Sequence, residues 1–166
     1  ITVKDDGAVV NQTPIIDGTY DGESIWGTPV VIADGLPGWA TANAKKLYLT
    51  QDNNYFYLGA DVEAESWQTW AFIVNSQSGG GTYDSWSRQI DYLHTNSPDH
   101  VLRGTFDGYA EFHNWNGTGW NGYSQQPASE YGVSTTWVEV RILKSAISNP
   151  LAADVQFYIT GNVNEH

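Results

Sequence analysis

The sequence has neither cysteine nor methionine among its 166 residues, and only 7 of these residues are lysine or arginine. Without cysteine, disulfides, thiolate metal sites and cysteine nucleophiles are excluded. The chain has 19 acidic residues, which gives a formal net charge of -12. Phosphate backbones and anionic lipid surfaces repel such a chain, so we expect no nucleic acid and no membrane as a partner. No apolar run approaches the roughly 20 residues that a membrane-spanning helix needs.

Signatures of common catalytic sites are also missing. The sequence contains no P-loop, no GxSxG, no HExxH, and no GxGxxG between a strand and a helix. Its histidines (His94, His100, His113 and His166) do not have the spacing of metal ligands. The many carboxylates leave a glycosidase-like pair open, but none stands in a segment with the character of a desolvated site. We therefore predict that the chain is not an enzyme.

Short segments of alternating apolar and polar residues dominate the chain, and turn-forming residues separate them. Residues 46–50 alternate, residues 51–54 (Gln-Asp-Asn-Asn) are typical of a turn, and residues 55–62 alternate again. This pattern predicts a β-hairpin. Further strands are predicted at 28–32, 70–75, 88–94, 101–106, 109–115, 137–142 and 155–160. Residues 143–149 allow one helical turn, which Pro150 would end.

Strands spaced in this way favour an all-β fold, an antiparallel β-sandwich of the jelly-roll type with at most one short helical turn. The length suits a single domain over residues 1–166. The chain opens at Ile1 and ends directly after a predicted strand. We therefore expect a module excised from a larger protein. The lack of cysteine, the acidity and the abundance of Asn, Gly, Thr and Trp are typical of secreted bacterial proteins.

Aromatic residues make up 14% of the chain, including 8 tryptophans. Trp26, Trp70 and Trp137 lie in or beside apolar runs and are predicted to be in the core. The other five stand among Gly, Ser, Asn, Thr and Gln: Trp39, Trp67, Trp86, Trp115 and Trp120. There, an indole offers an apolar face beside hydrogen-bonding groups, which suits stacking on a sugar ring. The alternative is that these rings cover the ends of the sandwich.

The predicted strand at 109–115 strengthens the first interpretation. Successive side chains of a strand point to opposite faces, so if Ala110 and Phe112 face the core, Tyr109, Glu111, His113 and Trp115 share the other face. Aromatics, a carboxylate and an imidazole together suit a polyol, although an ordinary solvent-exposed face is the alternative. The predicted carbohydrate-binding residues are Trp67, Tyr83, Trp86, Glu111, His113, Trp115, Asn116 and Trp120.

Calcium is the cofactor that the residues favour, because Ca²⁺ takes oxygens from carboxylates, amides and backbone carbonyls. Residues 17–23 and 61–65 are rich in such oxygens, and neither segment matches the EF-hand loop. Within the first segment, Asp17 and Asp21 are the predicted ligands of a structural Ca²⁺. Asp and Gly are also standard turn residues, so a plain turn is the alternative.

Several segments, in this order, resemble the family-9 carbohydrate-binding modules and their DOMON-like relatives. They are Ile16-Asp17-Gly18 with Asp21 and Trp26, the hairpin of residues 47–50 and 54–60, and Trp137 to Ile142 followed by Leu143-Lys144-Ser145. Residues 67–72, 84–88 and 109–120 are similar to modules appended to secreted bacterial α-amylase-type enzymes. Well-known members clamp a sugar between two tryptophans. Trp67 matches the first by position, and no tryptophan follows Trp137 to match the second.

The resemblance implies a β-sandwich, non-catalytic glycan binding and frequently a structural Ca²⁺. We therefore predict an extracellular module that binds a neutral polysaccharide, with α-glucan (starch) as the first candidate, and that targets a covalently attached glycoside hydrolase. The alternative is a structural or adhesion domain of a cell-surface protein whose aromatics contact other proteins.

Overall fold

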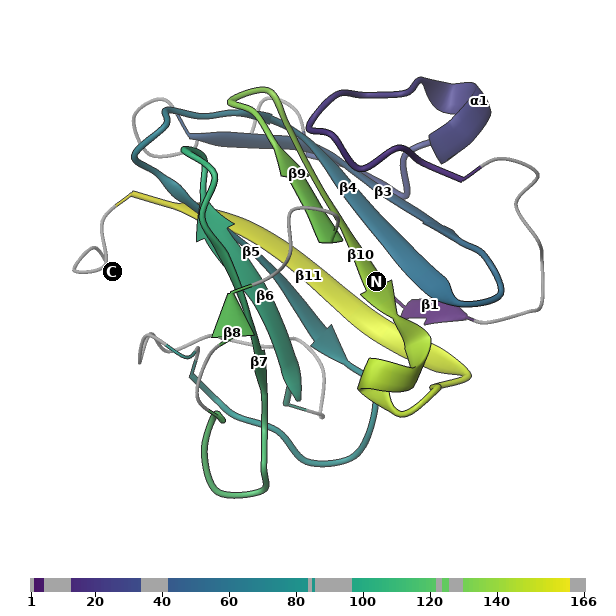
Figure 1. Cartoon of the computed structure of the whole chain (residues 1–166), viewed down its shortest axis with the longest axis vertical. Coiled ribbons are helices and arrows are strands. Elements are labelled where there is room, and N and C mark those ends of the chain that lie inside the picture. Colours follow the sequence, from purple (N-terminus) through teal and green to yellow (C-terminus); the bar gives the residue numbers. More distant parts are fainter. Residues whose placement is uncertain are drawn as a thin grey trace.

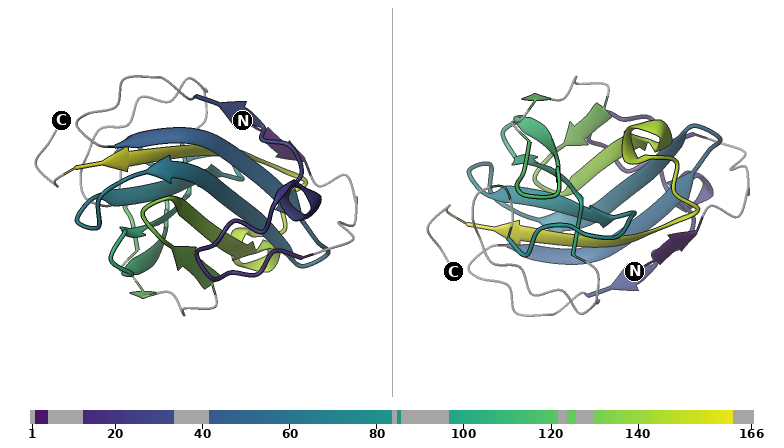
Figure 2. Two further views of the ribbon diagram at one scale, coloured as in Figure 1. Left: turned by 90° about the horizontal axis from the view of Figure 1, so that it is seen from above. Right: turned by 90° about the horizontal axis from the view of Figure 1, so that it is seen from below.

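The computed structural model describes residues 2–4, 13–33, 42–83, 85, 97–121, 124–125 and 130–161, with residues 2–4 and 124–125 as backbone only. In this part of the chain, two antiparallel sheets lie face to face (Figures 1 and 2). This arrangement confirms the predicted all-β sandwich.

The first sheet has the strand order β1-β11-β5-β6-β7-β8. Its strands are β1 (Thr2–Lys4), β11 (Ala152–Thr160), β5 (Thr69–Asn75), β6 (His100–Thr105), β7 (Ala110–Asn114) and β8 (Ser124–Gln125). Because β5, β6 and β7 are antiparallel neighbours, the β5–β6 loop and the β7–β8 loop leave the sheet at the same end.

The second sheet has the order β2-β3-β4-β10-β9. Its strands are β2 (Val31–Ile32), β3 (Asn43–Gln51), β4 (Tyr55–Glu63), β10 (Trp137–Leu143) and β9 (Tyr131–Val133). The predicted hairpin is confirmed as β3–β4. Asp52 closes its turn, since Oδ1 accepts hydrogen bonds from the backbone of Asn54 at 2.7 Å and Tyr55 at 2.8 Å.

The main core lies between the sheets. On β5, Trp70, Phe72 and Val74 alternate toward the core, and Leu58 of β4 and Val140 of β10 face them from the second sheet. Burying such apolar surface is the dominant favourable contribution to folding. The predicted core position of Trp70 is therefore confirmed.

A second cluster covers the outer face of the second sheet. It consists of Trp26, Tyr48, Tyr57 and Trp137, all buried. Trp26 belongs to α1 (Glu23–Trp26), a helical turn that the sequence pattern did not predict. Burial of Trp26 and Trp137 is thus confirmed, although in this outer cluster instead of between the sheets.

Residues 13–27 are fastened to this face by a buried carboxylate. Glu139 Oε1 accepts hydrogen bonds from the backbone nitrogens of Asp17 at 2.8 Å and Gly18 at 2.7 Å, and Oε2 accepts one from Trp137 Nε1 at 2.9 Å. Burial raises the pKa of Glu139, while these donors favour its ionised form. The segment also packs backbone to backbone, because a Cβ on Gly18 would lie 2.8 Å from the nitrogen of Val133.

Most predicted strands are present with shifted ends. The strand predicted at 28–32 is reduced to Val31–Ile32, and the one predicted at 88–94 lies outside the described residues. The predicted helical turn is the 3-10 turn η2 (Lys144–Ile147). The strands β1, β8 and β9 were not predicted because two or three residues are too few for a periodic pattern. Among the described residues, no helix has the length and apolar character needed to cross a membrane.

Candidate functional site

The predicted carbohydrate-binding residues separate to two ends of the sandwich. Trp67 lies in the turn between β4 and β5, whereas Tyr83, Trp115 and Trp120 lie in the β5–β6 and β7–β8 loops at the other end. In Figure 1 the β4–β5 turn is at the top and the β7–β8 loop at the bottom. Trp86, like Trp39, lies outside the described residues.

Tyr83, Trp115 and Trp120 form one aromatic cluster. The Trp115 ring meets Tyr83 edge to face, with centroids 5.9 Å apart and planes at 81°. It meets Trp120 in the same way at 5.4 Å and 77°. The indole of Trp120 also donates a hydrogen bond to the Tyr83 carbonyl at 2.8 Å. The structure therefore brings together three of the predicted residues, with Trp115 in the middle.

Gly81 packs directly against the aromatic cluster. A Cβ at this position would lie 3.0 Å from Cζ3 of Trp115 and 3.2 Å from Cζ2 of Trp120. Both indoles thus rest against the bare backbone of the β5–β6 loop, which only a glycine permits without displacement. The Gly81 N–H donates to the Pro98 carbonyl at 2.9 Å, which ties this loop to the start of β6.

The tip of the β7–β8 loop is ordered by Asn116. Its Oδ1 accepts hydrogen bonds from Thr118 N, Thr118 Oγ1 and Gly119 N, each at 3.0 Å. Its Nδ2 donates to Asn121 Oδ1 at 3.0 Å. This Asx turn brings Trp115 and Trp120 opposite each other in an antiparallel bridge. Asn116 is exposed, and both ends of its amide serve the turn.

Asp99 joins three strands beneath the aromatic cluster. The carboxylate accepts hydrogen bonds from the backbone and the hydroxyl of Ser76, at 2.9 and 3.0 Å. Its backbone carbonyl accepts one from Trp115 N at 2.8 Å, and its N–H donates to Val74 at 3.1 Å. Asp99 is buried, so breaking these bonds would leave buried polar groups with neither a protein partner nor water to bond.

His100 extends this network. Its Nε2 lies 3.0 Å from Ser76 Oγ, and its Nδ1 lies 2.5 Å from Asn114 Oδ1. Serine, imidazole and an orienting side chain in this order are also found in acyl-transfer triads. However, the hydroxyl has a second partner in Asp99, and the imidazole is buried. We interpret the network as support for the loops that carry the aromatic cluster.

Glu111 and His113 lie on the outer face of the first sheet, while Ala110 and Phe112 pack on the main core. This alternation agrees with the predicted strand. Both polar side chains are nonetheless buried, with exposed fractions of 4% and 6%. His113 Nε2 lies 2.9 Å from Glu111 Oε1, and Nδ1 lies 3.1 Å from the carbonyl of Asn121. His113 therefore connects Glu111 with the residue that follows Trp120.

Glu111 is a buried carboxylate whose pKa is held below its ordinary value. Burial by itself would raise its pKa, but hydrogen bonds from His113 and Tyr109 and the charge of Arg103 outweigh burial and lower the pKa to about 2. Tyr109 donates to Oε2 at 2.6 Å, and the guanidinium of Arg103 contacts Oε1. Arg103, Tyr109, Glu111 and His113 thus form a buried charged network on the outer face of the first sheet.

The predicted calcium ligands have local hydrogen-bonding roles. Asp17 Oδ1 accepts a hydrogen bond from Thr19 N at 2.9 Å, and Asp21 Oδ2 accepts one from Ile15 N at 2.8 Å. The first bond is that of an Asx turn, and the second joins residues six positions apart in the same segment. Within the described ranges, no three Asp, Glu or His side chains are grouped as a metal ion requires. The calcium site stays a prediction.

Trp67 is the most exposed of the described tryptophans, at 48%. Its indole donates a hydrogen bond to Glu65 within the same turn. It has the character of a stacking residue, but the length of β5 separates it from the aromatic cluster.

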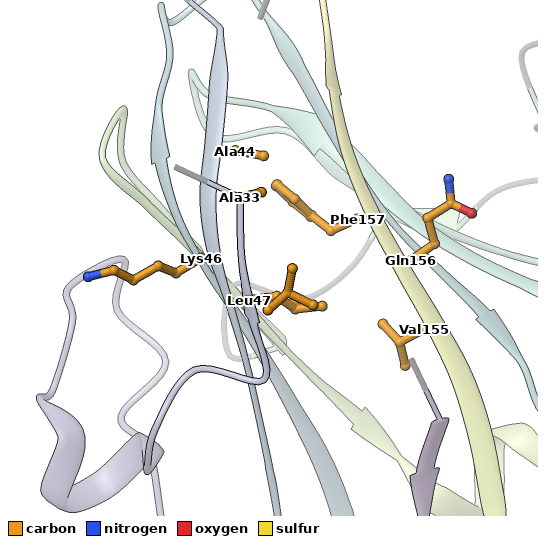
Figure 3. Close-up of a pocket in the computed structure, with 8 residues that line it drawn as sticks. Ala33, Ala44, Lys46, Leu47, Val155, Gln156 and Phe157 are labelled. Atoms are coloured by element: carbon orange, nitrogen blue, oxygen red, sulfur yellow. The ribbon is translucent and has the colours of Figure 1, made fainter. Parts of the chain in front are cut away.

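Hollows also lie on other parts of the sandwich. One, of about 210 Å³, opens between strands β2 and β3 of the second sheet and strand β11 of the first; Leu47, Val155 and Phe157 line it, and the polar ends of Lys46 and Gln156 point away (Figure 3). Its apolar lining offers little to a polyol. Another, of about 270 Å³, is more polar and is lined from the end of β5, the β5–β6 loop and β11.

Four supporting residues were not predicted from the sequence: Ser76, Asp99, His100 and Arg103. Their types gave no signal, because a serine and an aspartate between strands are expected in any loop. The positions of His100 and Arg103 in an apolar strand segment did indicate buried polar side chains. Such side chains need hydrogen-bonding partners.

Comparison with known protein families, curated proteins and solved structures finds no match to this chain.

Proposed function

We propose that this chain is a non-catalytic module that binds a neutral polysaccharide through the aromatic cluster. The observation that carries the proposal is the position of Trp115 at the end of the first sheet. Its ring is partly exposed and lies between the rings of Tyr83 and Trp120, each nearly perpendicular to it. Axial C–H bonds of a pyranose stack on such rings, and each aromatic contact contributes on the order of 1 kcal/mol. Affinity should therefore be modest and depend on several rings.

The angles between the rings favour a curved ligand. Planes at 77° and 81° cannot form one flat surface, so a crystalline face of parallel chains would contact one ring at a time. A single chain that bends, as an α-glucan does, can present different sugars to differently oriented rings. We therefore retain α-glucan, such as starch, as the first ligand to test.

Polar groups at the same end of the first sheet as the aromatic cluster suit the hydroxyls of a neutral sugar. The polar hollow is lined by Asn75, Ser76, Gln77, Ser78 and residues 152–154. The first four belong to the end of β5 and to the loop that continues to Gly81 and Tyr83. The net charge of -12 disfavours acidic polysaccharides such as alginate or pectin.

Glu111 and His113 act in this proposal as positioning residues. Because both are buried and paired with each other, they hold the β7–β8 loop through Asn121 and leave stacking to the rings. In the parent protein, the module would hold an attached glycoside hydrolase on its substrate outside the cell.

The test is affinity electrophoresis in native gels with and without soluble starch, followed by a panel of other neutral glucans. We expect starch to retard the wild type, and Trp115→Ala to weaken binding at least about tenfold. Tyr20→Ala is the control, because Tyr20 is an aromatic residue that is 38% exposed and packs on the opposite sheet. Circular dichroism establishes that each variant is folded.

Two outcomes would contradict the proposal. Full retardation of folded Trp115→Ala would move the site away from the aromatic cluster. A wild type that none of the glucans retards, and that self-associates, would favour a domain whose aromatics contact protein.

A further inference from the structure

Asn116 is followed by Gly117 at the exposed tip of the β7–β8 loop. We propose that Asn116 is a site of spontaneous deamidation, and that the fold accelerates the reaction at this position. The inference concerns the chemistry of the chain itself and does not depend on polysaccharide binding.

The nucleophile of this reaction is the backbone nitrogen of Gly117. Glycine has no side chain that could obstruct its approach to the neighbouring Cγ, and a Cβ built at Gly117 would meet nothing within 4 Å. In the described part of the chain, the Gly117 N–H has no hydrogen-bond acceptor that would have to be given up. The attacking group is thus open and unengaged.

The electrophile is the amide carbon of Asn116, which the turn activates. Attack at Cγ develops negative charge on Oδ1, and this oxygen already accepts hydrogen bonds from Thr118 N, Thr118 Oγ1 and Gly119 N at 3.0 Å. Donors fixed around an oxygen that gains charge stabilise the tetrahedral intermediate, as an oxyanion hole does. The same contacts that order the loop therefore lower the barrier to its modification.

The reaction balances with water as the only co-reactant. Gly117 N forms a bond to Cγ of Asn116 and loses its proton to solvent, while the Cγ–Nδ2 bond breaks and the nitrogen leaves as ammonia with a proton from water. The resulting five-membered succinimide is then hydrolysed. Opening at one carbonyl gives aspartate, and opening at the other gives isoaspartate, in which the main chain runs through the side-chain carbon.

Either product disturbs the loop. In the intact loop, Asn116 Nδ2 donates a hydrogen bond to Asn121 Oδ1 at 3.0 Å. In the product a carboxylate oxygen replaces this donor, so two acceptors face each other and the hydrogen bond is lost. Isoaspartate also lengthens the main chain between Trp115 and Trp120, which are now bridged. Deamidation should consequently loosen the edge-to-face contact of these two indoles.

The chain carries its own control. Asn121 also precedes a glycine, Gly122, but from the described residues its Oδ1 accepts one hydrogen bond, that of Asn116. The folded protein and the protein in urea are incubated in mildly alkaline buffer and digested. Mass spectrometry then measures the mass gain of amide-to-acid conversion at each position, and a protein isoaspartate methyltransferase detects the isomer.

We expect Asn116 to react about tenfold faster than Asn121 in the folded protein, and the two to react alike in urea, where the donors are lost. Thr118→Val removes the hydroxyl donor at nearly constant shape and should slow only Asn116, whereas Thr118→Ser should retain the rate. The proposal is overturned if Asn116 and Asn121 react equally in the folded state, if Asn116 reacts more slowly folded than in urea, or if Thr118→Val leaves its rate unchanged.

Discussion

Glu111 of β7 lies directly opposite Arg103 of β6, and its Oε1 contacts two nitrogens of the guanidinium. Both side chains are buried on the outer face of the first sheet. A buried pair of this kind is costly to break, because the partner that remains is an uncompensated charge. The pair thus fixes β7 against β6 next to the loops that carry the aromatic cluster.

The pKa of Glu111 predicts how stability depends on pH. It is about 2 in the folded protein, against an ordinary value of 4.5. Between these values the unfolded state binds more protons, so the contribution of Glu111 is fully present above about pH 4.5 and is lost as pH falls toward 2. Urea unfolding should show Glu111→Gln less stable than the wild type by about 3 kcal/mol at neutral pH, with the difference shrinking in acid.

The control for this experiment is Glu63→Gln. Glu63 lies at the exposed end of β4, and its carboxylate is 3.4 Å from Lys45. Exposed ion pairs contribute little, so the change should stay below about 1 kcal/mol. A Glu111→Gln difference that persists unchanged at acidic pH would contradict the assigned pKa.

The separation of Trp67 from Trp115 predicts additive effects on the proposed polysaccharide binding. The two rings lie at opposite ends of the first sheet and share no partner among the described residues, so they should contact different sugars or different chains. In a double-mutant cycle with Trp67→Ala and Trp115→Ala, the losses in binding free energy should add within about 0.5 kcal/mol. Isothermal titration with a soluble glucan measures this. A larger coupling energy would indicate that one sugar contacts both rings.

Glu139 should be among the most sensitive positions for stability. Glu139→Ala leaves the N–H groups of Asp17 and Gly18 and the indole N–H of Trp137 without their acceptor. We expect a loss of about 3 kcal/mol or more in the free energy of unfolding. Chemical denaturation followed by tryptophan fluorescence measures it. Glu23→Ala, at an exposed position in α1, should change stability by less than about 0.5 kcal/mol.

Gly18 and Gly22 form a matched pair for the packing of the N-terminal segment. Both have positive φ, 84° and 90°, but a Cβ at Gly18 would lie 2.8 Å from the Val133 backbone, whereas one at Gly22 meets nothing within 4 Å. Gly22→Ala should therefore cost only backbone strain, about 1–3 kcal/mol. Gly18→Ala should cost about 1–3 kcal/mol more, because the clash adds to the strain. Equal melting temperatures for the two variants would show that the segment can move away from β9.

The strands that could be predicted are those with enough alternating residues to show a period. The β3–β4 hairpin is an example, since both strands have nine residues and polar turn residues stand between them. Strands of two or three residues, such as β8 and β9, owe their existence to pairing with a neighbour. Local sequence carries no record of that pairing.

For the candidate site, the sequence predicted which face of a strand a side chain lies on, but not whether that face is buried. Alternation placed Glu111 and His113 on the face opposite Phe112, and the structure agrees. Their burial could not be predicted, because alternation assigns a face and says nothing of what covers it. The partners of Asp99 were equally out of reach, since Ser76 is 23 residues away in the chain.

By itself, the sequence determined which chemistry is available to this protein. The absence of cysteine, the excess of acidic residues and the supply of tryptophan follow from composition, and the all-β class follows from the short period of the apolar residues. Only the tertiary structure decided which aromatics act together. It gathered Tyr83, Trp115 and Trp120 and left Trp67 at the other end, because antiparallel pairing of β5, β6 and β7 brings alternate loops to the same end of a sheet.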